Sequence, residues 1–407
     1  MKKTGTKGRT VRCVAVTAAA AAAFGLGAPA MAARAPAARA PAGATAGRML
    51  GAGQVGSRAA VPWARVGPGW SLVLFSASQG GEGVKPKAGS STLYLVDPAG
   101  GRYRLFAWAA GTAQTRWNLQ AWSGDVRRAM FIPQNDVYNS GVRERVYQLQ
   151  LRTGALSSFT LPKNVSAVGY TRPDGLNILA ERAANIAPTA RGSLMRFSLT
   201  GHLVKNLATV RGLGQAAYQQ AGASLAAGSQ HGITLVSNAG GVIRQLRVPG
   251  VNDGCAAVLW WSARTILASC TTPATPGPRM WLVPASGARP TALTPARTNG
   301  FDQGDFNAWQ LSSGLYVNGY GACGQLVIGK QPARGPERMV TVPGSDSSLI
   351  VNATKTRLQV ERINGCSPGI SLVWFDPATR AMKVAIPVGH NQHGVVAVVP
   401  YFIAGKF

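Results

Sequence analysis

The sequence predicts an all-β fold, a seven-bladed β-propeller of four-stranded antiparallel blades. Three observations lead to this prediction. A strand–turn–strand unit recurs seven times, at intervals of about 46 residues. A second strand–turn–strand unit precedes it in each repeat, and no segment after the N-terminal leader shows a helical period of useful length. Four antiparallel strands every roughly 40 to 50 residues are typical of one propeller blade.

The first recurring unit is an apolar strand, a tight turn and a second strand. Its turns contain Asp-Pro, Thr-Gly and Asn-Ala-Gly, which favour chain reversal between β-rich runs. Its seven copies begin at Leu93, Val146, Leu194, Ile233, Met280, Leu326 and Ser371.

The second unit is an apolar strand that ends near an aromatic residue, then a polar turn, then another apolar strand. For the first repeat, residues 63–77 are expected to take this role, and residues 395–402 are expected to close the ring on a partner that the pattern leaves open. The other six copies begin at Leu119, Ala167, Gln215, Ala257, Phe306 and Ser348.

One repeat has a more specific pattern. Residues 171–179 (TRPDGLNIL), followed by residues 194–201 (LMRFSLTG), resemble a TolB-type propeller repeat. The turn at residues 122–125 (WSGD) resembles the same element, whereas residues 262–265 (SART) depart from the Ser-Pro-Asp-Gly pattern of that family. The resemblance covers two clear repeats and five degraded ones. It implies the propeller fold and no particular partner, because such propellers serve many functions.

The N-terminus predicts export. Residues 1–32 combine basic residues, an apolar alanine-rich stretch and the small-x-small triplet Ala30-Met31-Ala32, as in a secretory signal cleaved between Ala32 and Ala33. No later segment has 18 consecutive apolar residues, so we expect a secreted protein without a transmembrane segment.

Two further segments follow the signal. Residues 33–60 are rich in Ala, Pro and Arg and contain almost no bulky apolar side chain. Such a stretch buries too little surface to offset its ordering entropy, which predicts a flexible spacer. The propeller domain is then expected over residues 61–407.

Four cysteines remain after the signal, an even number that predicts two disulfides in an oxidising compartment. Cys255 and Cys270 flank the turn at residues 262–265 and are expected to face each other in one hairpin. Cys323 and Cys366 lie at nearly equivalent positions of consecutive repeats. We therefore predict the pairs Cys255–Cys270 and Cys323–Cys366. No Cys-x-x-Cys pair occurs, and the sequence indicates neither a metal nor a cofactor.

The charge is strongly positive: 42 Lys and Arg against 14 Asp and Glu give a formal net charge of +28. A field of that size attracts polyanions. Biased coding in a GC-rich genome is the alternative, because the arginines are spread along every repeat. A third hypothesis is adaptation to acidic surroundings, since few carboxylates means few groups to protonate as the pH falls.

The most informative polar stretch is residues 301–307 (FDQGDFN), at the expected start of the innermost strand of the sixth repeat. Innermost strands line a propeller channel, so Asp302, Asp305 and Asn307, with Trp309, form the candidate ligand-binding set. Oxygen ligands of this kind suit a cation, and paired carboxylates suit glycoside hydrolysis when correctly separated. The other inner-hairpin tryptophans are expected mostly to pack between blades. They are Trp117, Trp122, Trp260 and Trp261.

The leading functional hypothesis is a secreted, non-enzymatic binding or interaction module, with Asp302 and Asp305 at the channel mouth. Its expected partner is an envelope protein, a cell-wall glycan or an anionic polymer; we expect a monomer and find no specific nucleic-acid motif. One alternative is an extracellular propeller hydrolase or lyase, which requires convergent acid and base groups at the channel mouth. A second alternative is a cell-wall polyanion binder, which predicts arginines gathered on one face.

Overall fold

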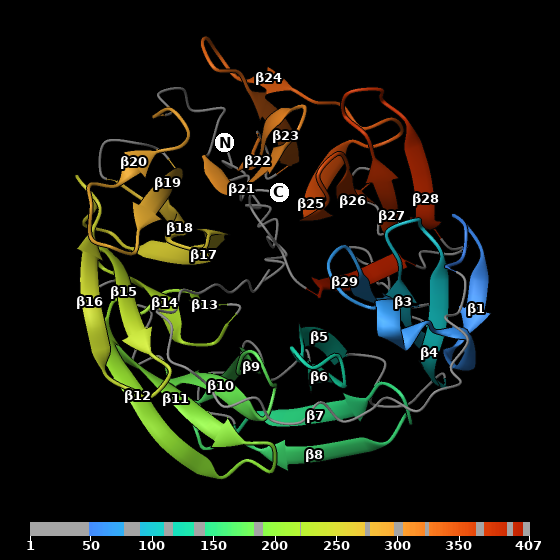
Figure 1. Ribbon diagram of the computed structural model, residues 1–407, viewed down its shortest axis with the longest axis horizontal. Coiled ribbons are helices and arrows are strands. Elements are labelled where there is room, and N and C mark those ends of the chain that lie inside the picture. The colour runs from blue at the N-terminus through green and yellow to red at the C-terminus, as the bar shows by residue number, and fades with distance from the viewer. Residues whose placement is uncertain are drawn as a thin grey trace, which may run out of the picture.

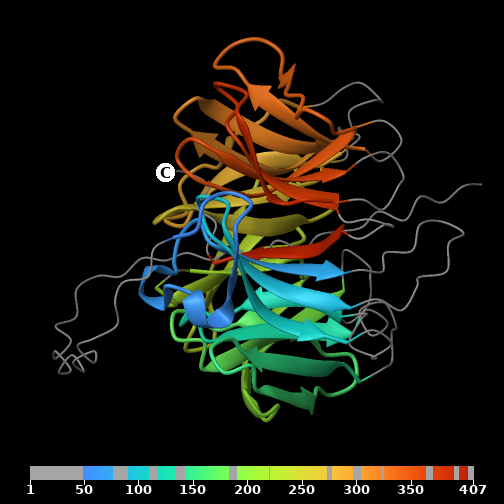
Figure 2. The same ribbon diagram turned by 90° about the vertical axis from the view of Figure 1, so that its right-hand side faces the viewer.

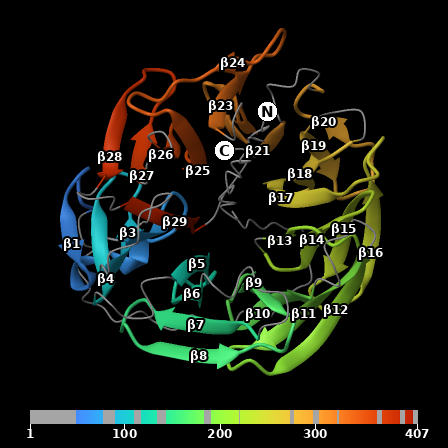
Figure 3. The same ribbon diagram turned by 180° about the vertical axis from the view of Figure 1, so that it is seen from behind.

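The computed structural model describes residues 49–76, 90–109, 117–133, 143–182, 190–219, 221–272, 277–296, 304–321, 325–363, 370–388 and 394–401. Their strands form seven sheets placed radially around a central axis (Figure 1). The view from behind shows the same closed ring (Figure 3). Two short 3-10 turns, η1 (Arg58–Ala60) and η2 (Trp63–Arg65), are the only helical elements within these residues. The predicted seven-bladed β-propeller is confirmed.

Each blade contains four antiparallel strands in order from the axis to the rim. Blade 1 contains β29 (Gly394–Pro400), β2 (Ser71–Ser76), β3 (Ser91–Val96), β4 (Arg102–Trp108) and an added outer strand, β1 (Val55–Ser57). Blade 2 contains β5 (Trp117–Trp122), β6 (Arg128–Pro133), β7 (Arg145–Gln150) and β8 (Leu156–Thr160). Blade 3 contains β9 (Ser166–Tyr170), β10 (Asn177–Arg182), β11 (Arg191–Ser198) and β12 (Leu203–Arg211).

Blades 4 to 7 repeat this order. Blade 4 contains β13 (Ala216–Tyr218), β14 (Ser224–Ser229), β15 (Gly232–Ser237) and β16 (Val242–Arg247). Blade 5 contains β17 (Cys255–Ser262), β18 (Thr265–Cys270), β19 (Arg279–Pro284) and β20 (Thr291–Ala292). Blade 6 contains β21 (Asp305–Leu311), β22 (Gly314–Tyr320), β23 (Leu326–Gln331) and β24 (Arg338–Met339). Blade 7 contains β25 (Ser347–Ala353), β26 (Leu358–Ile363), β27 (Ile370–Phe375) and β28 (Met382–Ile386).

Burial falls from the inner strands to the rim. The middle strands β6 and β14 are almost wholly buried, because neighbouring blades cover both faces of each sheet. Such strands read as continuous apolar runs rather than as alternating patterns. The rim strands β8 and β16 are exposed at nearly every position. The core is therefore a series of apolar clusters between blades, and the inner-hairpin tryptophans lie in it as expected: their exposed fractions are Trp117 4%, Trp122 2%, Trp260 1%, Trp261 8% and Trp309 0%.

The C-terminal strand closes the ring. β29 pairs with β2 through six residue pairs and is the innermost strand of blade 1 (Figure 1). Our expectation that residues 63–77 supply both inner strands of the first blade was wrong. Trp63 begins a 3-10 turn, and only Ser71–Ser76 forms a strand, so the chain end supplies the missing one.

The segment before residue 61 also differs from its expectation as a spacer. Val55–Ser57 forms β1, which pairs in parallel with β4 at the outer edge of blade 1. Two contacts with Tyr103 hold this segment: the backbone N–H of Leu50 donates to the Tyr103 hydroxyl at 3.2 Å, and Gly56 lies against the Tyr103 ring. Ordered structure thus begins at least six residues before the expected boundary. The signal at residues 1–32 and the rest of the spacer, up to residue 48, lie outside the described residues, and those boundaries stay predictions.

The predicted turn chemistry is present at the outer hairpins. The Asp97 carboxylate accepts hydrogen bonds from the backbone N–H groups of Ala99 (2.8 Å) and Gly101 (2.9 Å). Asp376 does the same for the N–H of Ala378 at 2.9 Å. These Asx turns reverse the chain between the third and fourth strands of blades 1 and 7, as the Asp-Pro pairs predict.

Candidate functional site

The strands of every blade run across the thickness of the disc (Figure 2). The turns that join the first and second strands of each blade therefore lie together on one face, which we call the turn face. Its turns within the described residues include residues 123–127, 171–176, 263–264, 312–313 and 354–357. Tyr401, directly after β29, reaches the same face, because β29 ends opposite Ser71, the start of β2.

An arginine crosses this face between blades that are not neighbours. Arg172, in the turn of blade 3, donates from Nη2 to the carbonyl oxygen of Tyr401 in blade 1 at 3.1 Å. Its guanidinium carbon lies 5.8 Å from the centre of the Tyr401 ring, within the range of a cation–π contact. Blade 2 lies between these two blades in the ring (Figure 1). Arg172 therefore spans the turn of blade 2.

Blade 2 leaves room for this crossing. A Cβ atom on Gly124 would lie 2.2 Å from the carbonyl oxygen of Pro173 and 3.1 Å from Cδ of Arg172. The Tyr401 hydroxyl donates to the carbonyl of Gly124 at 3.0 Å. The Trp122 ring packs edge-on against Tyr401, with centroids 5.3 Å apart. We call Trp122, Gly124, Arg172 and Tyr401 the rim cluster.

A carboxylate borders the rim cluster but is already engaged. Asp125 accepts from the Ser123 hydroxyl at 2.6 Å and from the N–H of Arg127 at 3.0 Å. Its second oxygen lies 3.7 Å from Nε of Arg127 and 3.5 Å from Nη1 of Arg128. Arg172 is thus the cation of this region without a direct carboxylate partner among the described residues.

Burial affects the groups here. It lowers the pKa of the half-buried Arg172 guanidinium, which stays cationic at neutral pH because arginine starts from so high a value. It raises the pKa of Tyr170, whose buried hydroxyl has no hydrogen-bond partner in the described part of the chain. The Trp122 Nε1–H is likewise buried and unpaired there. The rim cluster therefore offers a half-buried cation beside the half-buried ring of Tyr401, with Trp122 buried behind that ring.

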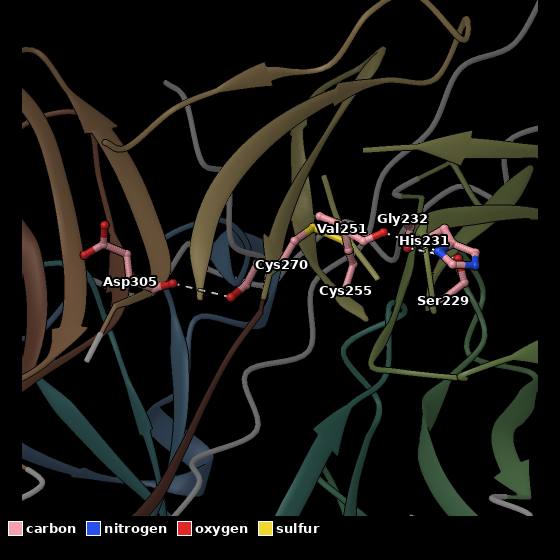
Figure 4. The surroundings of a disulfide bond; sticks show 8 residues. Ser229, His231, Gly232, Val251, Cys255, Cys270 and Asp305 are labelled. Carbon is pink, nitrogen blue, oxygen red and sulfur yellow. Dashed lines mark hydrogen bonds between the residues drawn. A yellow bond between two sulfur atoms is a disulfide. The ribbon is translucent and has the colours of Figure 1, made fainter. Parts of the chain in front are cut away.

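The residues that we predicted to bind a ligand are brought together on β21 and are covered. The exposed fractions are 1% for Asp305, 5% for Asn307 and 0% for Trp309. The carbonyl of Asp305 accepts from the Ser269 hydroxyl at 3.4 Å (Figure 4), and the side chain of Asn307 caps the N–H of Ala308 at 2.9 Å. Asp302 lies outside the described residues. A ligand-binding role for this set stays a prediction.

The predicted disulfide between Cys255 and Cys270 is present, with an S–S distance of 1.98 Å (Figure 4). Cys255 and Cys270 are directly opposite in the pairing of β17 and β18, as their symmetrical spacing about the turn predicted. Cys323 and Cys366 lie outside the described residues, so the second pair stays a prediction.

In the described ranges, no group of three His, Cys, Asp or Glu side chains gathers where a metal ion could bind. His202 and His231 are exposed residues of blades 3 and 4. No helix of the described chain is long and apolar enough to cross a membrane.

Sequence reasoning missed the rim cluster. The segments that carry it, residues 122–125 and 171–179, were recognised as turns that support the fold. A signal was present: Gly124 and Arg172 occupy the same place in consecutive repeats, which brings a residue without a side chain next to one with a long cationic side chain. The contact with Tyr401 links residues 229 positions apart, and no repeat pattern contains that information.

The chain was compared with known proteins. No protein-family model matches this sequence, and neither does any curated protein sequence. Among solved structures, a puromycin-hydrolysing peptidase from Mycobacterium tuberculosis is 17% identical with a TM-score of 0.50, over 78% of this chain and 52% of that one. Prolyl oligopeptidase B from Galerina marginata is 11% identical with a TM-score of 0.50, over 74% of this chain and 47% of that one. The chain thus spans about half the length of these two peptidases.

A third solved structure is that of a propeller domain by itself. The β-propeller domain of the Trilobed protease from Pyrococcus furiosus is 10% identical with a TM-score of 0.50, over 78% of this chain and 95% of that one. That domain is described as having an open velcro topology, whereas β29 pairs with β2 here.

These likenesses show the fold alone, but they correct our leading functional hypothesis. We expected a secreted, non-enzymatic binding module, whereas the three solved structures named above are peptidases or a part of one. The hydrolase alternative is therefore the better supported of the two. The resemblance to TolB-type repeats predicted the fold correctly, while membership of that type is a prediction still.

Proposed function

We propose that this chain is a peptidase-related propeller that receives peptide at its turn face, for hydrolysis by catalytic groups that the described residues do not contain. The observation that carries the proposal is the rim cluster. A cation with unused donors next to aromatic surface suits a peptide, which offers a terminal carboxylate, carbonyl oxygens and apolar side chains. The peptidases with the same fold add support at the level of architecture.

Arg172 is the residue that we assign to the peptide carboxylate. A guanidinium has five N–H donors, and within the described residues one of them is used, toward the carbonyl of Tyr401. A planar guanidinium can grip a carboxylate through two parallel bonds, which are stronger than neutral hydrogen bonds. The Arg172 guanidinium lies over the Tyr401 ring, and Trp122 packs against the same ring. The cation is therefore oriented before the peptide binds.

The proposal is tested by peptide binding to the full chain. The probe is a fluorescently labelled, proline-containing hexapeptide with a free C-terminal carboxylate, and its C-terminal amide is the matched ligand. We expect the acid to bind about tenfold more tightly than the amide, the effect of one charge-assisted hydrogen bond. Arg172→Met removes the difference, and Arg172→Lys retains part of it because the charge remains.

Arg264→Met is the control variant, because Arg264 is exposed in the equivalent turn of blade 5. It should bind both peptides as the original chain does. Equal binding of the acid and the amide by the original chain would contradict the proposal. So would an Arg172→Met variant, folded by circular dichroism, that still distinguishes them.

We also propose that the protein is exported. The predicted signal at residues 1–32 and the disulfide Cys255–Cys270 support this, because structural disulfides persist in oxidising compartments. N-terminal sequencing of the protein from the culture medium should begin at Ala33, and protein retained inside the cell with Met1 in place would contradict export.

A further inference from the structure

Blades 3 and 4 leave a groove between their outer strands. Its volume is about 470 Å³. β11 and β12 of blade 3 form one wall, and β15, β16 and the turn before β15 form the other. No aspartate or glutamate among the described residues lines it, whereas hydrogen-bond donors do. These are Arg191, Thr209, Arg211, Gln230, His231 and Arg247.

The arginines of this groove repel one another electrostatically. Arg191 and Arg211 are directly opposite each other in the pairing of β11 and β12. Like charges at directly opposite positions of an antiparallel pair destabilise it. Arg247 adds a third cation from β16, and no ion pair joins any of the three to a carboxylate in the described part of the chain. An anion in the groove would offset this repulsion.

The turn that carries the other donors is held in place. The Ser229 hydroxyl donates to the carbonyl of Gly232 at 3.0 Å, and Nδ1 of His231 lies 3.3 Å from the carbonyl of Val251 (Figure 4). The N–H of Gln230 donates to the carbonyl of Arg211 at 3.0 Å, which fastens the turn to blade 3. A Cβ atom on Gly232 would lie 2.1 Å from the carbonyl of Leu246, so only glycine permits this close approach.

The disulfide Cys255–Cys270 lies near this turn (Figure 4). Val251, which receives the His231 ring, is four residues before Cys255 and belongs to the same apolar cluster as both cysteines. The donors of the turn are therefore positioned before any ligand arrives, which lowers the entropy lost on binding.

We propose that this groove between blades 3 and 4 is a binding site for a phosphate group. Guanidinium groups from two blades suit a compact tetrahedral oxyanion, because their forked N–H donors match its oxygens. The side-chain amide of Gln230 and the hydroxyl of Thr209 supply neutral donors beside the charges. This groove lies between outer strands and shares no residue with the rim cluster on the turn face. Phosphate binding here does not depend on peptide binding there.

The test is a titration of the full chain with inorganic phosphate, followed by ³¹P NMR line width and by the melting temperature. Ionic strength is held constant with sodium chloride, because a chain of net charge +28 attracts any anion. We expect saturable binding of phosphate that chloride does not reproduce. Phosphoserine, titrated in parallel, separates the sources: tighter binding of phosphoserine assigns the site to an esterified phosphate, and tighter binding of phosphate to the free ion.

Arg211→Gln and Arg247→Gln should each weaken phosphate binding about tenfold, the effect of one charge-assisted hydrogen bond. Arg247→Lys, which keeps the charge and the fold, should weaken it less. Arg338→Gln is the matched control, since Arg338 is an exposed rim-strand arginine of blade 6, and it should leave binding unchanged. The proposal is overturned if binding is not saturable, or if Arg338→Gln weakens it as much as Arg247→Gln does.

Discussion

Two seams between neighbouring blades are held together in different ways. The closing seam, between blades 7 and 1, contains a buried polar chain. Nδ2 of Asn352 donates to the Ser71 hydroxyl at 3.1 Å, which donates to Oε1 of Gln359 at 2.6 Å. Nε1 of Trp374 donates to the carbonyl of Asp97 at 3.3 Å. Each bond joins residues more than 270 positions apart.

The open seam, between blades 3 and 4, joins consecutive repeats. Its inner part is apolar, and Arg196 of blade 3 donates to the side chain of Asn238 in blade 4 at 2.7 Å. Its outer part diverges into the arginine-lined groove. The comparison shows which seam of the ring depends most on stabilising contacts between blades. Consecutive blades are tethered by a short connection, whereas the closing seam brings distant parts of the chain together and pays the larger loop entropy.

The largest effect is expected from removing the closing strand. A chain that ends at Val388 lacks β29 and exposes the edge of β2 together with apolar residues of two clusters. We expect a loss of more than about 5 kcal/mol of unfolding free energy, because several buried side chains and a strand pairing are lost together. Urea denaturation measures it. Deleting residues 49–57, which removes β1 and leaves the ring closed, should lower the unfolding free energy much less. Equal losses from the two deletions would mean that ring closure by β29 contributes no more than an added edge strand.

The second prediction concerns pH. Glu361 lies in β26 two residues from Gln359, so both side chains face the closing seam. Its directly paired neighbours are Leu349 and Leu372, and burial raises its pKa from 4.5 to about 7. A raised pKa in the folded state favours folding at low pH and withdraws that stability as the pH rises from 4.5 to about 7.

Glu361→Gln should therefore match the original chain near pH 4 and exceed it at pH 8 by up to about 3 kcal/mol. Glu181, in the open seam, also has its pKa raised by burial to about 7, and its side chain is less completely covered. Glu181→Gln should give the smaller gain. Asp253→Asn, at an exposed position, is the control. The measurement is the denaturant midpoint of each variant and of the original chain at pH 4 and pH 8. The same difference in stability between a variant and the original chain at both pH values would rule out ionisation as the cause.

Breaking the polar chain of the closing seam should have an intermediate effect. Asn352→Leu keeps the volume roughly constant but removes the donor to Ser71 and the acceptor for the N–H of Ala353. We expect a loss of about 1–3 kcal/mol, because buried polar groups are left without partners. Tyr218→Phe in the open seam removes a longer, 3.3 Å bond to Asn238 and a contact with Arg196 at a less buried site, and should cost less. The reverse order would show that the closing seam does not depend on its polar contacts.

The smallest effect, and one of opposite sign, is expected at the groove. Without phosphate, Arg211→Gln relieves the repulsion between Arg191 and Arg211 and should stabilise the fold by about 0.2–1 kcal/mol. Thermal melting in phosphate-free buffer measures this. Addition of phosphate should reverse the order of the two proteins, since only the original chain gains from binding.

The sequence by itself determined the architecture. Seven hairpins with turn chemistry at regular spacing require a repeated β unit, and Cys255 and Cys270 flank their turn so evenly that one hairpin pairs them. These features are local, because each depends on residues that are near each other in the chain. Strand periodicity and turn residues act over a few positions, and they hold in any closed ring of this kind.

Only the tertiary structure decided how the ring closes and where its sites lie. β29 pairs with a strand more than 300 residues before it, Arg172 reaches Tyr401 across an intervening blade, and Arg191, Arg211 and Arg247 meet at one groove. It also buried Asp305, which the sequence placed at a channel mouth. Repeat patterns specify which residues belong to a strand, but contacts between strands that are distant in the chain arise from packing, and packing is a property of the folded whole.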